Sequence, residues 1–216
     1  MNKTETGCFI SFEGMDGSGK STQLRLLAEC LQKNRIDAVF TREPGGTGIS
    51  ELIRGIIIDK ANSSMDCMTE VLLYAASRAQ LVSEVIKPAL GLGKTVVCDR
   101  FADSSVAYQG FGRRLGRDAV EKINSFALRG LEPDLTVFLD VPPEKSMMRK
   151  QAQEFDRLET ETMEFHQTVY VGYRELVKAN PTRFFTVDAS LDPLDIHKII
   201  LKKLGGLKQF ARIFAD

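Results

Sequence analysis

Residues 8–22 read CFISFEGMDGSGKST, in which a short apolar run leads into a glycine-rich turn and then into Lys20 and Ser21. Residues 14–21 match the pattern G-x-x-x-x-G-K-[ST] at every fixed position. Glycines in such a turn let the backbone approach a polyphosphate closely, and the helix that follows adds roughly half a positive charge at its N-terminus. The stretch therefore predicts a phosphate-binding loop, made of Gly14, Met15, Asp16, Gly17, Ser18, Gly19, Lys20 and Ser21.

Two residues of this loop have predicted chemical roles. Lys20, expected to be exposed, would neutralise the β- and γ-phosphates of a nucleoside triphosphate, and the Ser21 hydroxyl would bind Mg²⁺. A second metal ligand is predicted from the segment 95–99, an apolar run that ends in the carboxylate of Asp99. Lys20 and Asp99 are therefore candidate catalytic residues. A loop of this kind binds ATP or GTP without specifying a reaction.

Apolar runs of strand type alternate along the chain with segments of helical periodicity. The predicted strands are 8–12, 38–41, 95–99, 135–141 and 183–187. The predicted helices are 21–33, 48–59, 67–90, 118–129, 159–179 and one that begins near 193. This alternation is typical of a doubly wound α/β fold with a five-stranded parallel sheet flanked by helices. No internal repeat or linker divides the chain, so we expect residues 1–216 to form a single domain.

The composition limits the classes of partner. The 216 residues include 29 basic and 29 acidic side chains, so no strong field attracts nucleic acid or an anionic membrane. The N-terminus reads MNKTETG and no apolar stretch approaches eighteen residues, which predicts a cytoplasmic protein with no membrane segment. Four cysteines, at 8, 30, 67 and 98, lack metal-ligand spacing and are expected to be reduced thiols.

Arginines in the first half of the chain predict a second anionic ligand. Arg42 and Arg100 directly follow predicted strands, at the sheet edge where ligands bind, and Arg54 and Arg78 lie on predicted helices. A guanidinium group binds phosphate in a bidentate manner. Two phosphate-bearing ligands that face each other are what a kinase needs, whereas a motor or switch needs hydrolysis machinery. Both histidines of the chain lie in late predicted helices, away from this edge.

Other segments leave alternatives open from residue pattern alone. Tyr74 and Arg78 share one helix face, which is compatible with simple packing and a salt bridge. Residues 101–116 are polar and glycine-rich, and too long to be a mere connection. Residues 144–158, EKSMMRKQAQEFDRL, are compatible with a solvated helix or with a lid.

Four motifs in order resemble the bacterial thymidylate kinase family, and the similarity covers nearly the whole chain. They are the phosphate loop from Phe12 to Thr22, the segment TREPGGT at 41–47, the segment YAASR at 74–78, and DRF at 99–101 with Ser105, Tyr108, Gln109 and Gly110. The resemblance implies the fold of nucleoside monophosphate kinases, with a lid at about 144–158. It also implies a homodimer that packs through helices including residues 67–90.

The resemblance further implies roles in binding dTMP. Tyr74 would stack on thymine and Arg78 would bond the O4 edge of the base. Arg100, with help from Arg54, would hold the phosphate of dTMP. These assignments join Arg42, which we predict to contact substrate from its position at a strand end.

Further positions complete the implied pocket. Ser105 and Gln109 would contact the base side, and Tyr108 would crowd the position of a ribose 2′-hydroxyl. Asp16 and Glu43 would lie near the sugar and the phosphate.

Two departures from the family pattern affect the site. The stacking residue is more often Phe, so Tyr74 adds a hydroxyl that needs a protein partner or a water. Ser18 stands where some members place an arginine that bridges the two phosphates, so the lid would supply it. Arg149 is the first candidate for this catalytic cation and Arg157 the second, held in a local pair by Asp156; Lys150 is a further possibility.

The resemblance implies phosphorylation of dTMP to dTDP by ATP and Mg²⁺, a step in dTTP synthesis. The second phosphate pKa of a monoester is about 6, so the acceptor is largely dianionic near neutral pH and needs no general base. Catalysis would then consist of in-line positioning and charge neutralisation. The alternatives are a P-loop kinase for another nucleoside monophosphate or a deoxynucleoside, and a non-enzymatic nucleotide switch.

Overall fold

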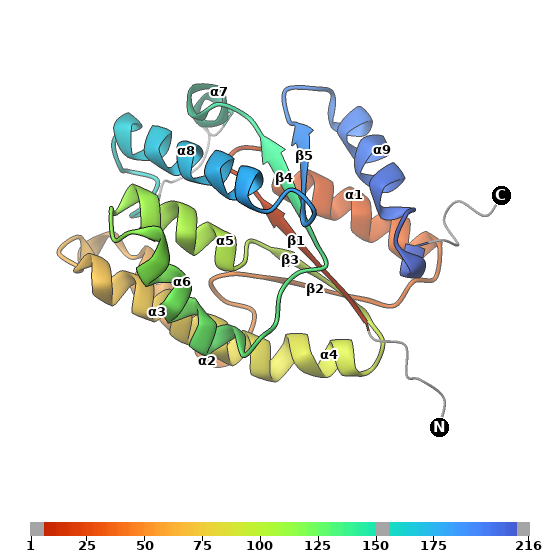
Figure 1. The fold of residues 1–216 in the computed structure, drawn as a ribbon, viewed down its shortest axis with the longest axis horizontal. Coiled ribbons are helices and arrows are strands. Elements are labelled where there is room, and N and C mark those ends of the chain that lie inside the picture. Colours follow the sequence, from red (N-terminus) through yellow and green to blue (C-terminus); the bar gives the residue numbers. More distant parts are fainter. Residues whose placement is uncertain (1–6, 150–155, 211–216) are drawn as a thin grey trace.

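The computed structural model describes residues 7–149 and 156–210. Its centre is a single five-stranded parallel sheet, as predicted, with the strand order β2-β3-β1-β4-β5 (Figure 1). The strands are β1 Cys8–Glu13, β2 Ala38–Arg42, β3 Thr95–Asp99, β4 Leu135–Asp140 and β5 Phe184–Asp188. Each lies within a few residues of its predicted range.

The phosphate loop leaves the central strand of this sheet. β1 pairs with β3 on one side and β4 on the other, and the strand order changes direction beside it. Phe12 of β1 and Arg42 of β2 both align with Asp99 of β3, so three strands end at the same level. The loops that carry the predicted site therefore meet at one edge, where ligands bind in open α/β sheets.

Helices cover both faces of the sheet (Figure 1). The longer ones are α1 Lys20–Lys33, α2 Gly48–Ile58, α3 Cys67–Leu81, α6 Arg117–Leu128, α8 Met163–Ala179 and α9 Pro193–Leu204. The shorter ones are the 3₁₀ helix Lys60–Asn62, α4 Lys87–Gly91, α5 Ala102–Ser105 and α7 Pro143–Met148. Two π-helical segments, η2 Val82–Ile86 and η3 Val106–Gly112, join neighbouring helices.

The two π-helical segments bear on two expectations. η2 links α3 to α4, so the predicted helix 67–90 is helical to Gly91, with Pro88 in the first turn of α4. Residues 102–112, whose polar, glycine-rich sequence has no clear helical period, are helical in α5 and η3. π turns are frequent at functional sites, and η3 carries Tyr108 and Gln109 to the sheet edge.

Successive side chains of β1 point to opposite faces of the sheet, so this strand contributes to two hydrophobic cores. Ile10 and Phe12 pack with α1 and α9 on one face, whereas Phe9 packs with α3 and α4 on the other. Glu13 lies two pleats beyond Phe9 and so points to the same face, the one that α8 also covers. This fully buried carboxylate is therefore placed under the ligand edge of the sheet.

The remaining composition-based expectations concern cysteines and surface charge. Cys8 and Cys98 are buried in strands, Cys30 and Cys67 are half-buried, and all four are free thiols. Burial raises the pKa of Cys8 to about 12, which keeps this thiol protonated and unreactive.

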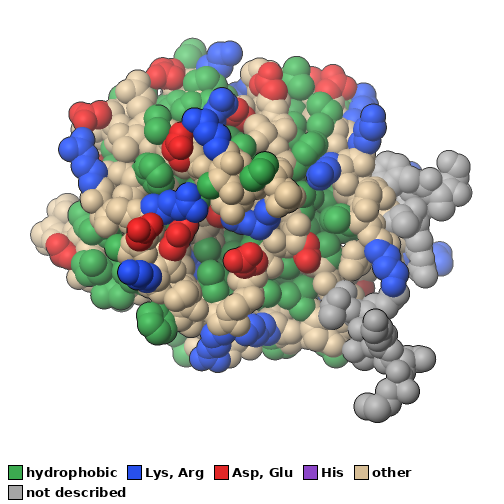
Figure 2. All heavy atoms as spheres, in the orientation of Figure 1, with side chains coloured by type: hydrophobic (Ala, Val, Ile, Leu, Met, Phe, Trp, Pro, Cys, Tyr) green, Lys and Arg blue, Asp and Glu red, His purple; other side chains and the backbone are tan. Residues whose placement is uncertain are grey.

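In the described ranges, no helix is long and apolar enough to cross a membrane. Acidic and basic side chains intermingle over the visible face, in keeping with the zero net charge (Figure 2).

Candidate active site

A cavity of about 650 Å³ opens at the carboxyl edge of the sheet. Its lining comes from the phosphate loop, the loops after β2 and β3, helix α3, segment η3 and residues of the predicted lid. Every predicted site residue lines this cavity except Gly14, Met15 and Arg157. The topology thus brings together residues that are up to 133 positions apart in the chain, from Asp16 to Arg149.

The backbone of the phosphate loop needs its glycines. Gly17 and Gly19 have φ angles of 82° and 97°, in the region that residues with a Cβ rarely adopt. A Cβ at Gly17 would also collide with the backbone carbonyl of Ser146 on the lid helix α7. The Ser146 hydroxyl donates a hydrogen bond to the Asp16 carbonyl, so the first part of the lid rests directly on this loop.

Lys20 is buried, contrary to the expectation that it is exposed. Its Nζ donates hydrogen bonds to the carbonyls of Gly14 and Met15, both at 3.0 Å, and only 7% of the residue is exposed. Burial, with a further contribution from the positive charge of Arg100, lowers the pKa of Lys20 to about 8. The loop's own carbonyls therefore hold the ammonium group in place before any phosphate arrives.

Asp99 and Ser21 fit the requirements of a magnesium site. Asp99 Oδ1 is buried and accepts no hydrogen bond within the described part of the chain, and Ser21 lies exposed on the same cavity. Oxygen ligands of this kind suit Mg²⁺, which usually combines one or two protein groups with water and substrate phosphates. No group of three or more His, Cys, Asp or Glu side chains that could hold a metal ion occurs in 7–149 or 156–210.

Arg100 is the centre of a polar network on the acceptor side. Its Nη2 donates to Asp16 Oδ1 at 2.6 Å, and its Nη1 donates to the hydroxyls of Ser104 and Tyr173 at 3.2 and 3.1 Å. The guanidinium carbon lies 5.2 Å from the centre of the Tyr108 ring. Several contacts thus fix this arginine in one orientation, with its backbone in the left-handed region at φ 68°.

Glu13 supports this network and was not predicted as a site residue. Its carboxylate accepts hydrogen bonds from the Phe101 amide at 2.7 Å, from the Ser104 hydroxyl at 2.6 Å and from the Tyr173 hydroxyl at 2.9 Å. Burial, reinforced by the negative charge of Asp103, raises the pKa of Glu13 to about 7. The sequence signal that could have found it is a carboxylate at the end of a central strand, which is buried on both faces.

Arg78 and Glu43 form a buried ion pair beneath the cavity. The Arg78 Nη2 to Glu43 Oε2 distance is 2.5 Å, and both side chains are almost fully buried. Arg78 also donates to Asn124 on α6 at 2.6 Å and to Ser105 at 3.0 Å. Among the predicted substrate-binding residues, Arg78 therefore bonds both Glu43 and Ser105. Asn124 was missed because nothing near it in the sequence marks it.

The other two predicted phosphate-side arginines lie around the loop after β2. Arg42 donates to the Pro44 carbonyl at 2.9 Å and forms a half-exposed salt bridge with Glu51. Arg54, on α2, donates to the same carbonyl at 3.1 Å. A single backbone oxygen thus holds both guanidinium groups at the cavity wall.

The predicted base-side residues approach the cavity from α3 and η3. Tyr74 is half-buried and lines the cavity, and burial raises its phenol pKa, which keeps the hydroxyl protonated. Tyr108 is buried, and its hydroxyl donates to Asp16 at 3.2 Å. Gln109 is also buried, and its amide nitrogen donates to Glu70 at 2.9 Å.

The lid residues separate into two groups. Arg149, at the end of α7, lines the cavity and donates to the Ala189 carbonyl at 2.9 Å. Lys150 lies outside the described residues. Arg157 is not part of the cavity lining; it donates to Glu70 at 2.6 Å and to the Ile57 carbonyl at 2.9 Å. Arg157 thus bonds the buried carboxylate of Glu70, which the sequence did not predict as its partner.

The cavity as a whole has the chemistry of a two-phosphate site. One side presents the phosphate loop and Lys20, and another presents Arg100 with the aromatic residues Tyr74 and Tyr108. Neither His166 nor His197 lines it. A general base among the histidines is thus absent from the lining, as the sequence indicated.

Comparisons with known proteins agree with this arrangement. A family model described as thymidylate kinase matches residues 12–200. A thymidylate kinase of Caldanaerobacter subterraneus subsp. tengcongensis is 50% identical over 207 residues, which cover 96% of this chain and 99% of that protein. One from Lactobacillus acidophilus is 50% identical over 208 residues, covering 94% of each chain. The crystal structure of thymidylate kinase from Ehrlichia chaffeensis is similar with a TM-score of 0.75 and 34% identity, covering 92% of this chain and 98% of its own.

Proposed function

Because this chain belongs to the thymidylate kinase family and phosphorylates dTMP with ATP, we propose that the whole reaction takes place in the cavity at the sheet edge. The observation that carries the proposal is the single cavity lined by both the phosphate loop and the Arg100 network. In it, the γ-phosphoryl group of ATP passes in line to a phosphate oxygen of dTMP, which becomes dTDP, a step towards dTTP.

On the donor side, the phosphate loop binds the triphosphate of ATP. Backbone amides of residues 14–21 surround the β-phosphate, and Lys20 exchanges its two carbonyl partners for phosphate oxygens. Ser21 and Asp99 would hold Mg²⁺, which would neutralise negative charge on the donor phosphates. The buried Asp99 oxygen without a partner in the described residues supports this assignment.

On the acceptor side, the residues orient a nucleophile that is already charged. Arg100, with Arg54, binds the phosphate of dTMP, whose second pKa of about 6 leaves it largely dianionic. Tyr74 packs on the thymine ring, and Arg78 and Ser105 lie at its polar edge. Tyr108, held by Asp16, fills the space next to the sugar. Arg42 and Glu43 support the loop that faces the phosphate.

Arg149 provides the positive charge between the two phosphates. It is the lid arginine on the cavity wall, whereas Ser18 of the phosphate loop carries no charge. A cation at this position contributes roughly 10³–10⁵ in rate in related phosphoryl transfers. The lid also excludes water that would otherwise hydrolyse ATP.

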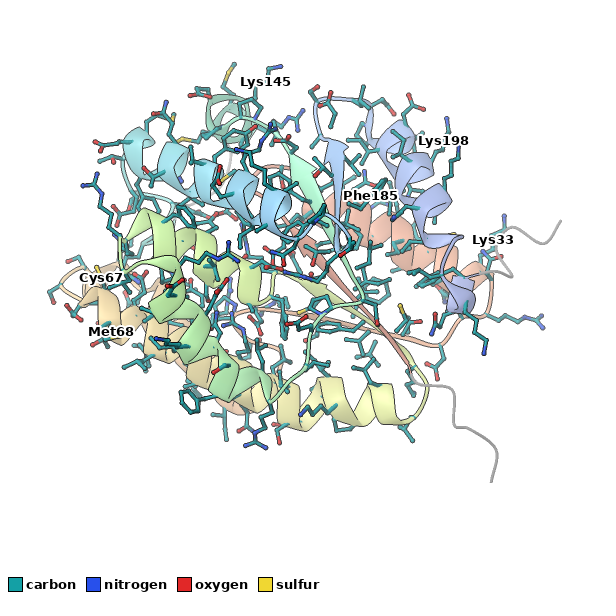
Figure 3. The ribbon with its side chains drawn as sticks, in the orientation of Figure 1. Lys33, Cys67, Met68, Lys145, Phe185 and Lys198 are labelled. Atoms are coloured by element: carbon teal, nitrogen blue, oxygen red, sulfur yellow. The ribbon has the colours of Figure 1, made fainter. Side chains whose placement is uncertain are left out.

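The protein acts as a homodimer in the cytoplasm. Large apolar side chains are exposed on α2 and in the first half of α3, and Figure 3 labels one of them, Met68. They are Ile49, Leu52, Ile56, Met68 and Leu72. Exposed apolar surface is typical of protein–protein contacts, and α2 packs against α3, so a second copy can cover both. Light scattering should give twice the monomer mass for the wild type and less for Leu52→Glu.

A coupled assay with a panel of acceptors tests the reaction. With ATP and Mg²⁺, we expect dTMP to be preferred over dUMP, dGMP, dCMP and dAMP. Equal rates with dTMP and dCMP would contradict the proposed base pocket. Loss of all transfer on removal of Mg²⁺ by a chelator, with recovery on its addition, would test the metal.

A further inference from the structure

Glu70 is a buried carboxylate that touches the base side of the cavity without lining it. It lies in the first turn of α3, four residues before Tyr74, and is fully shielded from solvent. Its oxygens accept hydrogen bonds from Arg157 at 2.6 Å, from Arg113 at 3.2 and 3.3 Å, and from the Gln109 amide nitrogen at 2.9 Å. Nothing in the proposed reaction uses this group directly.

The charge environment of Glu70 determines which end of the Gln109 amide it can bind. Two guanidinium groups contact the carboxylate, and an ionised carboxylate only accepts hydrogen bonds. It can therefore bind the NH₂ end of the Gln109 amide and would repel the carbonyl end. The direction of an amide side chain follows from its hydrogen-bond partners, and here the partner permits one direction.

The opposite end of the same amide is left for a ligand. Gln109 lines the cavity together with Tyr74, and its carbonyl oxygen accepts no hydrogen bond within the described residues. The planar amide thus offers a hydrogen-bond acceptor on the side away from Glu70. A pyrimidine stacked on Tyr74 would meet that acceptor with one edge.

Thymine and cytosine differ at the ring atom that such an acceptor would meet. N3 of thymine carries a proton and donates a hydrogen bond, whereas N3 of cytosine is an acceptor. A buried acceptor placed opposite cytosine N3 would lose its partner and repel the base. A site that binds its substrate through a buried hydrogen bond rejects analogues that cannot form this bond. Its selectivity is far greater than that of an apolar pocket.

We propose that Glu70 is a positioning residue for pyrimidine selectivity: it fixes the Gln109 amide with its carbonyl oxygen as an acceptor for thymine N3–H. The inference rests on the proposed placement of thymine beside Tyr74. It extends that placement to a residue outside the cavity lining. A purely structural role for Glu70 would change all acceptor substrates alike.

Glu70→Gln tests the role of the charge. The new amide can donate to the Gln109 carbonyl, so Gln109 can reverse and present its NH₂ group to the base. We expect the ratio of kcat/KM for dTMP to kcat/KM for dCMP to fall at least about tenfold. The matched control is Glu161→Gln, because Glu161 contacts the same Arg113 at 2.6 Å but not Gln109. In Glu161→Gln, the ratio of kcat/KM for dTMP to kcat/KM for dCMP should stay within about twofold of the wild-type ratio.

An analogue assay on the wild type keeps the test independent of whether the variant folds. In 3-deaza-dCMP a C–H replaces the N3 acceptor of cytosine, so the repulsion from a fixed Gln109 carbonyl is removed. We expect this analogue to be phosphorylated at least about tenfold more efficiently than dCMP. An unchanged ratio in folded Glu70→Gln, or no gain with the analogue, overturns the inference. If the wild type failed to phosphorylate dTMP, the proposed function itself would be wrong.

Discussion

The Arg78 guanidinium lies 2.5 Å from the Glu43 carboxylate in a pair that is almost fully buried and joins α3 to the loop after β2. These residues are 35 positions apart, so the pair ties the base-side helix to the loop that also holds Arg42 and Arg54. It therefore has a structural role as well as a place at the cavity wall.

Arg78→Ala should reduce stability as well as substrate binding. Removing the arginine leaves Glu43 buried without its charged partner, which costs about 3–5 kcal/mol in the free energy of unfolding. Loss of the hydrogen bond to the thymine edge should cost a further 1.5–3 kcal/mol, roughly, in dTMP binding. Urea unfolding measures the first effect. Arg114→Ala is the control, since its pair with Glu164 is exposed and should change stability by less than about 1 kcal/mol.

Arg149→Ala should lower kcat by at least about a hundredfold with little change in the KM for dTMP, because the charge is needed in the transition state. Arg157→Ala should mainly lower the melting temperature, since this side chain is buried against Glu70. Steady-state kinetics and thermal unfolding of both variants separate the two roles. Equal, small losses of kcat in both would mean that the lid is only a cover, and Arg42 or Lys150 would become the candidate.

Lys20→Ala should abolish transfer, and the wild type should take up protons when it binds ATP. The pKa of Lys20 is lowered to about 8, and phosphate oxygens that replace its carbonyl partners should raise it. At pH 8 about half of the side chains are neutral before binding, so binding should take up about half a proton. Calorimetry in buffers of different ionisation enthalpy measures this number. The uptake should vanish in Lys20→Ala; persistence there would assign it to another group.

Glu13→Gln should alter how stability depends on pH. The pKa of Glu13 is raised to about 7 in the folded state, so its protonated form favours folding. The stability that protonated Glu13 contributes is fully present below about pH 4.5 and is lost as the pH rises through 7. The free energy of unfolding changes by about 3 kcal/mol at most over this range. The variant should therefore gain stability relative to the wild type between pH 4.5 and 7, with no further gain above. Denaturant unfolding of both proteins at four pH values tests this. If the difference between their free energies of unfolding were the same at every pH, the raised pKa of Glu13 would be refuted.

Tyr108→Ala should weaken discrimination against the ribonucleotide, because the ring fills the space next to the proposed sugar position. The ratio of kcat/KM for dTMP to that for ribothymidine monophosphate measures it. Tyr108→Phe keeps the ring and loses the hydrogen bond to Asp16, so it should fall between the wild type and the alanine variant. An alanine variant with an unchanged ratio would mean that another residue excludes the ribose.

The parts that local patterns encode could be predicted from the sequence. The five strands and the phosphate loop follow from apolar runs and from the glycine spacing around Lys20. The topological rule for parallel sheets then places Arg42, Asp99 and Arg100 at one edge.

Side-chain partners could not be predicted in the same way. Tyr173 reaches Glu13 across 160 positions, and Glu70 reaches Arg157 across 87, so no local period marks either contact. The burial of Lys20 depends on carbonyls of its own loop, which a pattern match does not describe. The sequence shows that a buried charged residue needs a partner of opposite charge. It does not show which residue the fold places next to it.

The π turn in η3 restricts how this helix can change length during evolution. Tyr108 and Gln109 lie inside a turn that holds more residues than an α-helical one. A turn of this kind accommodates its extra residue locally, so deleting one residue would return the segment to α-helical geometry while the helix on either side keeps its phase. The residues inside the turn would then point in new directions, and Tyr108 and Gln109 are among them. Point substitutions can adjust this wall one residue at a time, whereas a single-codon deletion would redirect both side chains at once.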